Sequence, residues 1–123
     1  MFELPPIYEE QFGTMEYFRL KANHSHERMF VRDMSRSYVR IRVMHEGWTD
    51  GEWVCLDELI FRESSWDKDA KNPNSSAFGL FQTLKTDPDT PLKKQTERGI
   101  KYIKHRYDTP CEALAFHDRK GWY

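Results

Sequence analysis

A glutamate at the end of an apolar helical run is the residue of this sequence best suited to acid and base chemistry. The apolar positions before Glu63 follow helical spacing: Trp53, Leu56, Leu59 and Ile60. Glu63 therefore falls at the edge of the face that these side chains bury. A carboxyl group among apolar neighbours loses hydration of its charged form, which raises its pKa and suits a general acid. The same spacing also fits an ordinary surface glutamate, because Glu is a common helix former.

The segment after Glu63 supplies a polar loop, a glycine and a glutamine. Residues 67–76 are rich in Asp, Asn, Ser and Pro, which predicts a loop. Gly79 then allows the backbone, and Gln82 with it, to come close to whatever Glu63 acts on. Together these segments predict an active-site cleft.

Glu63 with Ser64 forms one block in this region, and the Gly-Leu-Phe-Gln sequence of residues 79–82 forms a second. The two blocks resemble the Glu-Ser pair and the Gly-Leu-Met-Gln block of the soluble lytic transglycosylases, which are relatives of goose-type lysozyme, with Phe81 in place of Met. Several such blocks occur in the right order over residues 48–123, which makes the resemblance specific, whereas one block alone would be weak.

The downstream blocks extend the resemblance to the end of the chain. Gly99 with Tyr102 and Ile103 is similar to the family's Gly-x-x-Tyr-Leu helix. Residues 115–117 occupy its Ala-Tyr-Asn position, although His117 replaces the Asn and can titrate. Residues 121–123 resemble a variant found in transglycosylase domains of phage virion proteins.

The resemblance implies a mainly α, lysozyme-like helical domain with at most a minor β element. It also implies cleavage of the MurNAc-GlcNAc β-1,4 bond of peptidoglycan by Glu63 alone, with no cofactor and no metal. The C6 hydroxyl of the MurNAc ring would attack its own C1, so one glutamate would first donate and then accept a proton. The expected substrate-contact residues are Ser64, Phe81, Gln82, Tyr102, Phe116, His117, Trp122 and Tyr123.

Two other function classes stay open. A goose-type lysozyme hydrolase would need a second carboxylate, and the candidates nearest in sequence are Asp67, Asp69, Asp87 and Asp89. All four lie in polar loop segments, where Asp commonly forms turns, which favours transglycosylation. A non-catalytic wall-binding or virion protein is the other class, and the intact Glu63 and Gln82 speak against it.

Composition limits the partners. The chain has 123 residues, enough for one domain, and a formal net charge of -1, which argues against bulk attraction to nucleic acid or anionic membrane. We expect a monomer that binds peptidoglycan strands and does not insert into membranes. The N-terminus shows no secretory signal, so something else would deliver the protein to the wall, such as phage lysis or a virion.

The N-terminal region, residues 1–47, is expected to pack on the catalytic domain, residues 48–123. An irregular arm leads to a short helix capped by Thr14, and a second helix follows residues 23–26 and runs to about His45. Its predicted apolar face consists of Phe30, Met34, Tyr38, Ile41 and either Met44 or His45. The predicted opposite face carries an arginine stripe, Arg28, Arg32, Arg36 and Arg40, which is more typical of a solvated surface than of a site for anionic polymer.

Capping signals predict where the later helices begin. Thr49 and Glu52 form a capping-box pattern ahead of the helix that carries Glu63. Pro91 is expected as the first residue of a helix to about Tyr107, and Thr109 is expected to cap a last helix through His117. Residues 78–83 are expected to pair briefly with another loop.

The two cysteines, Cys55 and Cys111, do not form a disulfide framework by count. Both lie on expected helices near the cleft, so a bond between them is possible. We favour the interpretation that they are two small buried apolar residues.

Overall fold

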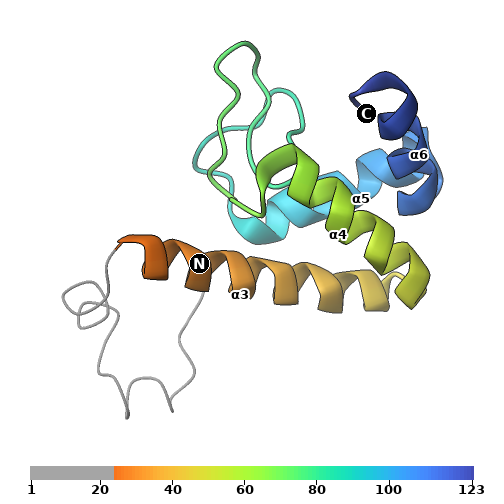
Figure 1. Ribbon diagram of the computed structural model, residues 1–123, viewed down its shortest axis with the longest axis horizontal. Helices are drawn as coiled ribbons and strands as arrows, with labels where there is room; N and C mark the ends of the chain where they lie inside the picture. Colours follow the sequence, from red (N-terminus) through yellow and green to blue (C-terminus); the bar gives the residue numbers. More distant parts are fainter. Residues whose placement is uncertain (1–23) are drawn as a thin grey trace.

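The computed structural model describes residues 24–123, and the predicted mainly α fold is confirmed there. Four helices make up this part of the chain: α3 His24–His45, α4 Asp50–Ser64, α5 Leu92–Arg106 and α6 Pro110–Lys120. In Figure 1 the long α3 runs beneath α4 and α5, while α6 packs on α4 at the end that also holds the C-terminus. The expected arm and the helix capped by Thr14 lie outside the described residues, and the domain division at residue 47 stays a prediction.

No helix among residues 24–123 is long and apolar enough to cross a membrane.

The loop between α4 and α5 contains the predicted short pairing. Phe78 forms isolated antiparallel bridges with Lys71 and with Thr83. The segment from residue 77 to residue 81 is buried, so this loop is packed on the helices. It therefore forms a fixed wall beside the end of α4.

The threonine caps are confirmed, but half of the predicted capping box is wrong. The Thr49 hydroxyl accepts a hydrogen bond from the Glu52 amide at 3.3 Å, and Thr109 does the same for Glu112. The Glu52 carboxylate does not reach back to its own helix start. It accepts a hydrogen bond from the Cys111 amide at 2.9 Å, because the unpaired amides of the first turn of α6 lie beside it. Glu52 thus caps a neighbouring helix.

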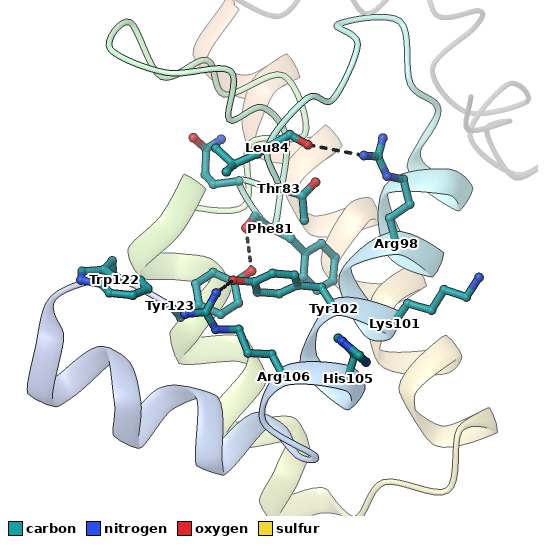
Figure 2. A pocket seen from close by; sticks show the side chains of 11 residues that line it. Phe81, Thr83, Leu84, Arg98, Lys101, Tyr102, His105, Arg106, Trp122 and Tyr123 are labelled. Carbon is teal, nitrogen blue, oxygen red and sulfur yellow. Dashed lines mark hydrogen bonds between the residues drawn. The ribbon is translucent and has the colours of Figure 1, made fainter.

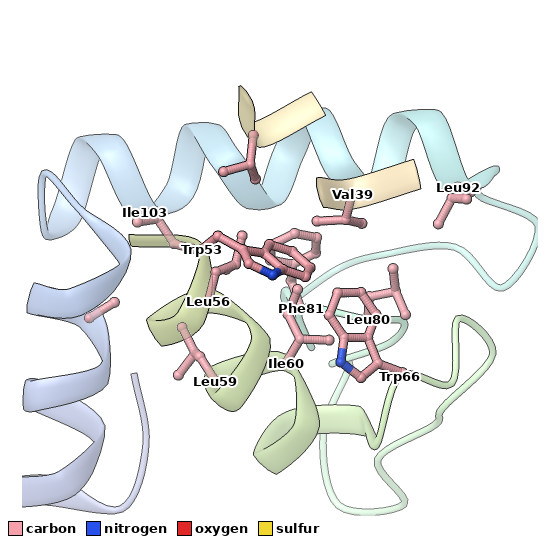
Figure 3. Packing of buried hydrophobic residues seen from close by; sticks show 12 residues of the cluster. Val39, Trp53, Leu56, Leu59, Ile60, Trp66, Leu80, Phe81, Leu92 and Ile103 are labelled. Carbon is pink, nitrogen blue, oxygen red and sulfur yellow. The ribbon is translucent and has the colours of Figure 1, made fainter. Parts of the chain in front are cut away.

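The hydrophobic core lies where α4 and α5 meet the buried loop (Figure 3). Leu56, Leu59 and Ile60 of α4 are fully buried against Leu80 of the loop and Ile103 of α5. The predicted apolar spacing of α4 is therefore confirmed. The end of the helix that bears Glu63 is held by this packing.

The predicted apolar face of α3 is wrong by a rotation of about one residue. Val39 and Val43 are completely buried, whereas Ile41 and Met44 are 57% and 62% exposed. Tyr38 still packs against the core from the side. The larger apolar side chains suggested the wrong stripe, because α4 and α5 cover a face of small residues that repeats every four positions.

Two arginines of the predicted stripe on α3 lie beside α4. Arg36 forms a two-pronged ion pair with Asp57 of α4, with N–O distances of 2.9 and 2.6 Å. The guanidinium groups of Arg36 and Arg40 lie 5.9 and 5.8 Å from the ring centre of Trp53. These two arginines contact α4, yet they remain exposed, as does Arg28, so the expected solvated surface is confirmed for these three positions.

A disulfide joins Cys55 of α4 to Cys111 of α6. The favoured interpretation of two unpaired thiols is therefore wrong. The contact of Glu52 with the Cys111 amide brings the start of α6 against the first turns of α4, which places the two cysteines together. This cross-link connects the two helices that carry Glu63 and His117.

Candidate active site

Glu63 lies in the last turn of α4, where the helix ends abruptly. Ser65 follows in the left-handed conformation, with φ of 52°, and its amide closes the helix on the Phe61 carbonyl. The Glu63 side chain is 18% exposed, and its burial raises the pKa of the carboxyl group above the ordinary value. Desolvation favours the protonated form, which is the form that a general acid requires.

Two C-terminal side chains lie near the Glu63 carboxylate. Nε2 of His117 is 3.6 Å from Oε1 of Glu63, and the imidazole is 15% exposed. Burial, and then the charge of Glu63, raise the pKa of Tyr123 well above its usual range. The Tyr123 phenol therefore stays protonated, and its hydroxyl donates a hydrogen bond to the Phe81 carbonyl at 2.6 Å. The structure thus brings Glu63 together with His117 and Tyr123 of the C-terminal segment, more than 50 residues away in the sequence.

Ser64 occupies a different place from the one expected of a substrate-contact residue. Its side chain is buried, and its hydroxyl lies 3.2 Å from the Ile60 carbonyl and 2.8 Å from the Leu80 carbonyl. Ser64 thus joins the end of α4 to the loop that carries Phe81 and Gln82. Its position suits it to holding this loop in place.

Gln82 is anchored by its amide nitrogen. This nitrogen donates to the carbonyls of Ala70 and Gly79, at 2.9 and 2.8 Å, and the residue adopts a left-handed φ of 51°. A substrate contact from Gln82 would therefore use the side-chain oxygen as an acceptor.

Gln95 is a structural residue that sequence reasoning missed. Its oxygen accepts from the Leu80 amide at 3.0 Å, while its nitrogen donates to the carbonyls of Lys68 and Thr90. The residue is buried on α5 and so fixes both ends of the α4–α5 loop. The available signal was a polar side chain on the apolar stripe of residues 92–103.

A groove of about 870 Å³ lies next to this cluster, between the α4–α5 loop, α5 and the C-terminal segment (Figure 2). Five of the predicted contact residues line it: Phe81, Gln82, Tyr102, Trp122 and Tyr123. Glu63 does not line the groove, but Tyr123 contributes to its wall and also interacts with Glu63. The catalytic candidate and the groove are therefore adjacent and share one side chain.

Phe81 and Phe116 are placed differently from each other. The Phe81 side chain is 2% exposed and packs against Gly99, so its ring belongs to the core, although the residue borders the groove. Phe116 is half-buried and packs on Tyr107 and Trp122, with ring centres 5.3 and 4.9 Å apart. It supports Trp122 from outside the groove lining.

Arg62 connects α4 to the helix that carries His117, and the sequence did not identify it as a site residue. Its guanidinium pairs with Glu58 and with Asp118, and one nitrogen lies 3.5 Å from Nδ1 of His117. The side of the imidazole away from Glu63 therefore faces a permanent positive charge. No local pattern predicts this contact, since Arg62 and Asp118 are 56 residues apart.

Within residues 24–123, no group of three or more His, Cys, Asp or Glu side chains could hold a metal ion.

Comparison with known proteins gives one distant relative. The chain is 29% identical over 85 residues to a protein of Staphylococcus haemolyticus (strain JCSC1435) named "Probable transglycosylase IsaA". The matched segment covers 69% of this chain but 34% of that protein, so the chain spans about a third of the relative's length. No family model and no solved structure matches the chain. The similarity supports a distant relationship to a transglycosylase-like family.

Proposed function

We propose that this protein is a lytic transglycosylase that cleaves the MurNAc-GlcNAc β-1,4 bond of peptidoglycan. The observation that carries the proposal is the position of Glu63, a mostly buried carboxyl group with a raised pKa beside a groove lined by aromatic side chains. Aromatic faces suit sugar rings, and a protonated carboxyl suits a glycosidic leaving group. The distant similarity to a probable transglycosylase supports the same function.

Glu63 would act in both halves of the reaction. The protonated carboxyl donates its proton to the glycosidic oxygen as the C1–O bond breaks and positive charge develops on the MurNAc ring. The resulting carboxylate then accepts the proton of the C6 hydroxyl as that oxygen bonds to C1. Because the attacking hydroxyl belongs to the same sugar, its high effective molarity replaces a positioned water.

The loop aspartates support this mechanism over hydrolysis. Asp67 accepts a hydrogen bond from the Asp69 amide at 2.9 Å, which is a local turn, and Asp69 pairs with Lys68. Asp87 and Asp89 are exposed on the loop before α5. Within residues 24–123, the side-chain hydrogen bond of Asp67 and the ion pair of Asp69 do not involve Glu63. The setting of the enzyme, phage lysis or a virion, stays a prediction from residues 121–123.

Replacing Glu63 by Gln tests the proposal. The amide keeps the shape of the side chain but cannot donate the proton, so cleavage of purified sacculi should fall at least about 10²-fold, the usual contribution of a general acid. Glu112→Gln is the control, because Glu112 is exposed at the start of α6. Mass spectrometry of the products should show 1,6-anhydro ends.

Three results would count against the proposal. Residual activity of Glu63→Gln within tenfold of the unmodified protein would remove Glu63 from the mechanism. Reducing ends in place of anhydro ends would indicate a goose-type hydrolase. Binding to sacculi without any cleavage would indicate a non-catalytic wall-binding protein.

A further inference from the structure

The charged residues that line the groove are all basic within residues 24–123. Arg98, Lys101 and Arg106 line it together with His105, and none of the described lining residues is an Asp or a Glu. The whole chain has a formal net charge of -1, so this concentration of positive charge does not follow from composition. A groove with one sign of charge raises the local concentration of ligands of the opposite sign.

The basic residues form one side of α5. Positions 98, 101, 102, 105 and 106 are spaced as one helical face, opposite the buried stripe that includes Ile100 and Ile103. Arg98 and His105 are two turns apart, about 10 Å along the axis at 1.5 Å per residue. Figure 2 shows Arg98 reaching toward the Leu84 carbonyl and Arg106 reaching toward Tyr123 beside Tyr102, while Lys101 extends to the other side of α5 in this view.

These groups are not committed to acidic partners within the described part of the chain. The ion pairs there use other cations, such as Lys104 with Glu46 and Lys94 with Glu97. Among residues 24–123, the Arg98 guanidinium donates one hydrogen bond, to the Leu84 carbonyl at 3.4 Å. Arg106 is held by Tyr102 and by the Trp122 ring, 5.2 Å from its centre. The aromatic rings fix this arginine in the groove wall without neutralising it.

We propose that this basic face of α5 binds the carboxylates of a peptide stem, so that the protein prefers peptidoglycan strands that carry stems over bare glycan. The inference rests on the proposed function, which places a glycan strand in the adjoining site. A stem of three or four residues, at about 3.5 Å per extended residue, matches the 10 Å length of the basic stripe. The aromatic residues would hold the sugar, and Arg98 and Lys101 would hold the stem.

The test compares binding of two soluble glycan fragments, one with intact peptide stems and one from which an amidase has removed them. All proteins carry Glu63→Gln, so that no fragment is cleaved during titration. With the basic face intact, we expect at least about tenfold tighter binding of the stem-bearing fragment at low salt. This preference should shrink as salt is raised, because the contacts are between charges.

The double variant Arg98→Gln/Lys101→Gln should reduce the preference for the stem-bearing fragment to less than about twofold. The control pair Lys93→Gln/Lys120→Gln removes the same charge from exposed positions outside the groove and should keep it. The pair Arg98→Lys/Lys101→Arg retains both charges and should also keep it. Thermal unfolding of each variant establishes that the compared proteins are folded.

Equal binding of the two fragments by the protein with an intact basic face would overturn the inference. Binding of a phosphate polymer such as teichoic acid that depends on Arg98 and Lys101, without a stem preference, would also overturn it and assign the groove to a different anion. Cleavage of sacculi is measured separately. A stem preference without cleavage would therefore reject the proposed function alone, and cleavage without a preference would reject this inference alone.

Discussion

Nε2 of His117 lies 3.6 Å from Oε1 of Glu63, and both side chains are less than one-fifth exposed. The two residues come from α6 and α4, which are also joined by the Cys55–Cys111 bond. A protonated imidazole at this distance would favour the carboxylate form of Glu63, whereas desolvation favours the protonated form. The carboxyl group whose pKa is raised by desolvation therefore lies 3.6 Å from an imidazole nitrogen.

This arrangement predicts the pH dependence of cleavage. The acid form of Glu63 is the active form at the first step, so activity should fall as pH rises through its raised pKa. His117→Asn removes an imidazole whose positive charge would favour the carboxylate form of Glu63, so the decline should move to higher pH. The maximum rate should stay within about tenfold of that of the unmodified protein, because His117 transfers no proton in the proposed mechanism. His45→Asn, on the exposed end of α3, should leave the profile unchanged. Superimposable profiles for His117→Asn and the unmodified protein would show that the two groups are uncoupled.

Reducing the disulfide should destabilise the protein and weaken catalysis. The bond closes a loop across a separation of 56 residues, for which loop entropy gives about 4 kcal/mol of stabilisation. Denaturant unfolding with and without a reductant measures this directly. A Cys55→Ser/Cys111→Ser variant should unfold like the reduced protein and should not respond to reductant. If reduction leaves both stability and cleavage unchanged, the cross-link has no part in holding α6 on α4.

Gly99 should tolerate no side chain. A Cβ at this position would overlap the buried ring of Phe81, so Gly99→Ala should cost about 1–3 kcal/mol by overpacking. Gly51→Ala is the matched control in α4, where the nearest atom to the new Cβ is 3.7 Å away. It should be neutral or slightly stabilising, since Ala is the better helix former. Equal effects of the two changes in thermal unfolding would argue against the close contact of Phe81 with α5.

Which face of α3 is buried can be tested with substitutions at two neighbouring positions, Val43 and Met44. Val43→Ala removes two buried methyl groups and should lower the free energy of unfolding by about 2 kcal/mol. Met44→Ala changes a larger side chain, but one that is 62% exposed, and should stay within about 0.5 kcal/mol. The reverse order of the two effects in urea unfolding would restore the face expected from the sequence.

Local signals were enough to predict the mainly α fold and the place of Glu63. The threonine caps depend on residues three positions apart, and the spacing from Trp53 to Glu63 repeats within a single helix. Such features need no knowledge of what packs against them. They were therefore readable from the chain, and the structure confirms both the caps and the buried stripe of α4.

Features that depend on two distant segments could not be predicted in this way. Glu52 has the right spacing for its own helix, yet it contacts Cys111, 59 residues away. The positions of α4 and α5 determine which face of α3 is buried. The Ser64 side chain is buried because its hydroxyl donates a hydrogen bond to the Leu80 carbonyl. The partners of these residues are determined by tertiary packing, which helical periodicity does not contain.

The loop aspartates distinguish the two possible mechanisms. If water were the nucleophile, a second carboxylate would have to activate it, and its removal should cost at least about two orders of magnitude. Asp67, the one nearest to Glu63 in sequence, already accepts a hydrogen bond within its own turn, and Asp87 and Asp89 are exposed. We therefore expect single Asp→Asn changes at positions 67, 69, 87 and 89 to lower the rate of cleavage less than about tenfold.

The products of these variants provide the second readout. Intramolecular attack by the C6 hydroxyl should give 1,6-anhydro ends in every active variant, because the nucleophile is carried by the sugar. Asp67→Asn is the most informative change, because its side-chain oxygen can still accept the hydrogen bond from the Asp69 amide while the negative charge is removed. Asp67→Ala, which loses the acceptor as well, measures the effect of the turn contact itself. Loss of activity in both Asp67 variants, together with reducing ends from the unmodified protein, would identify Asp67 as the water-activating base of a hydrolase.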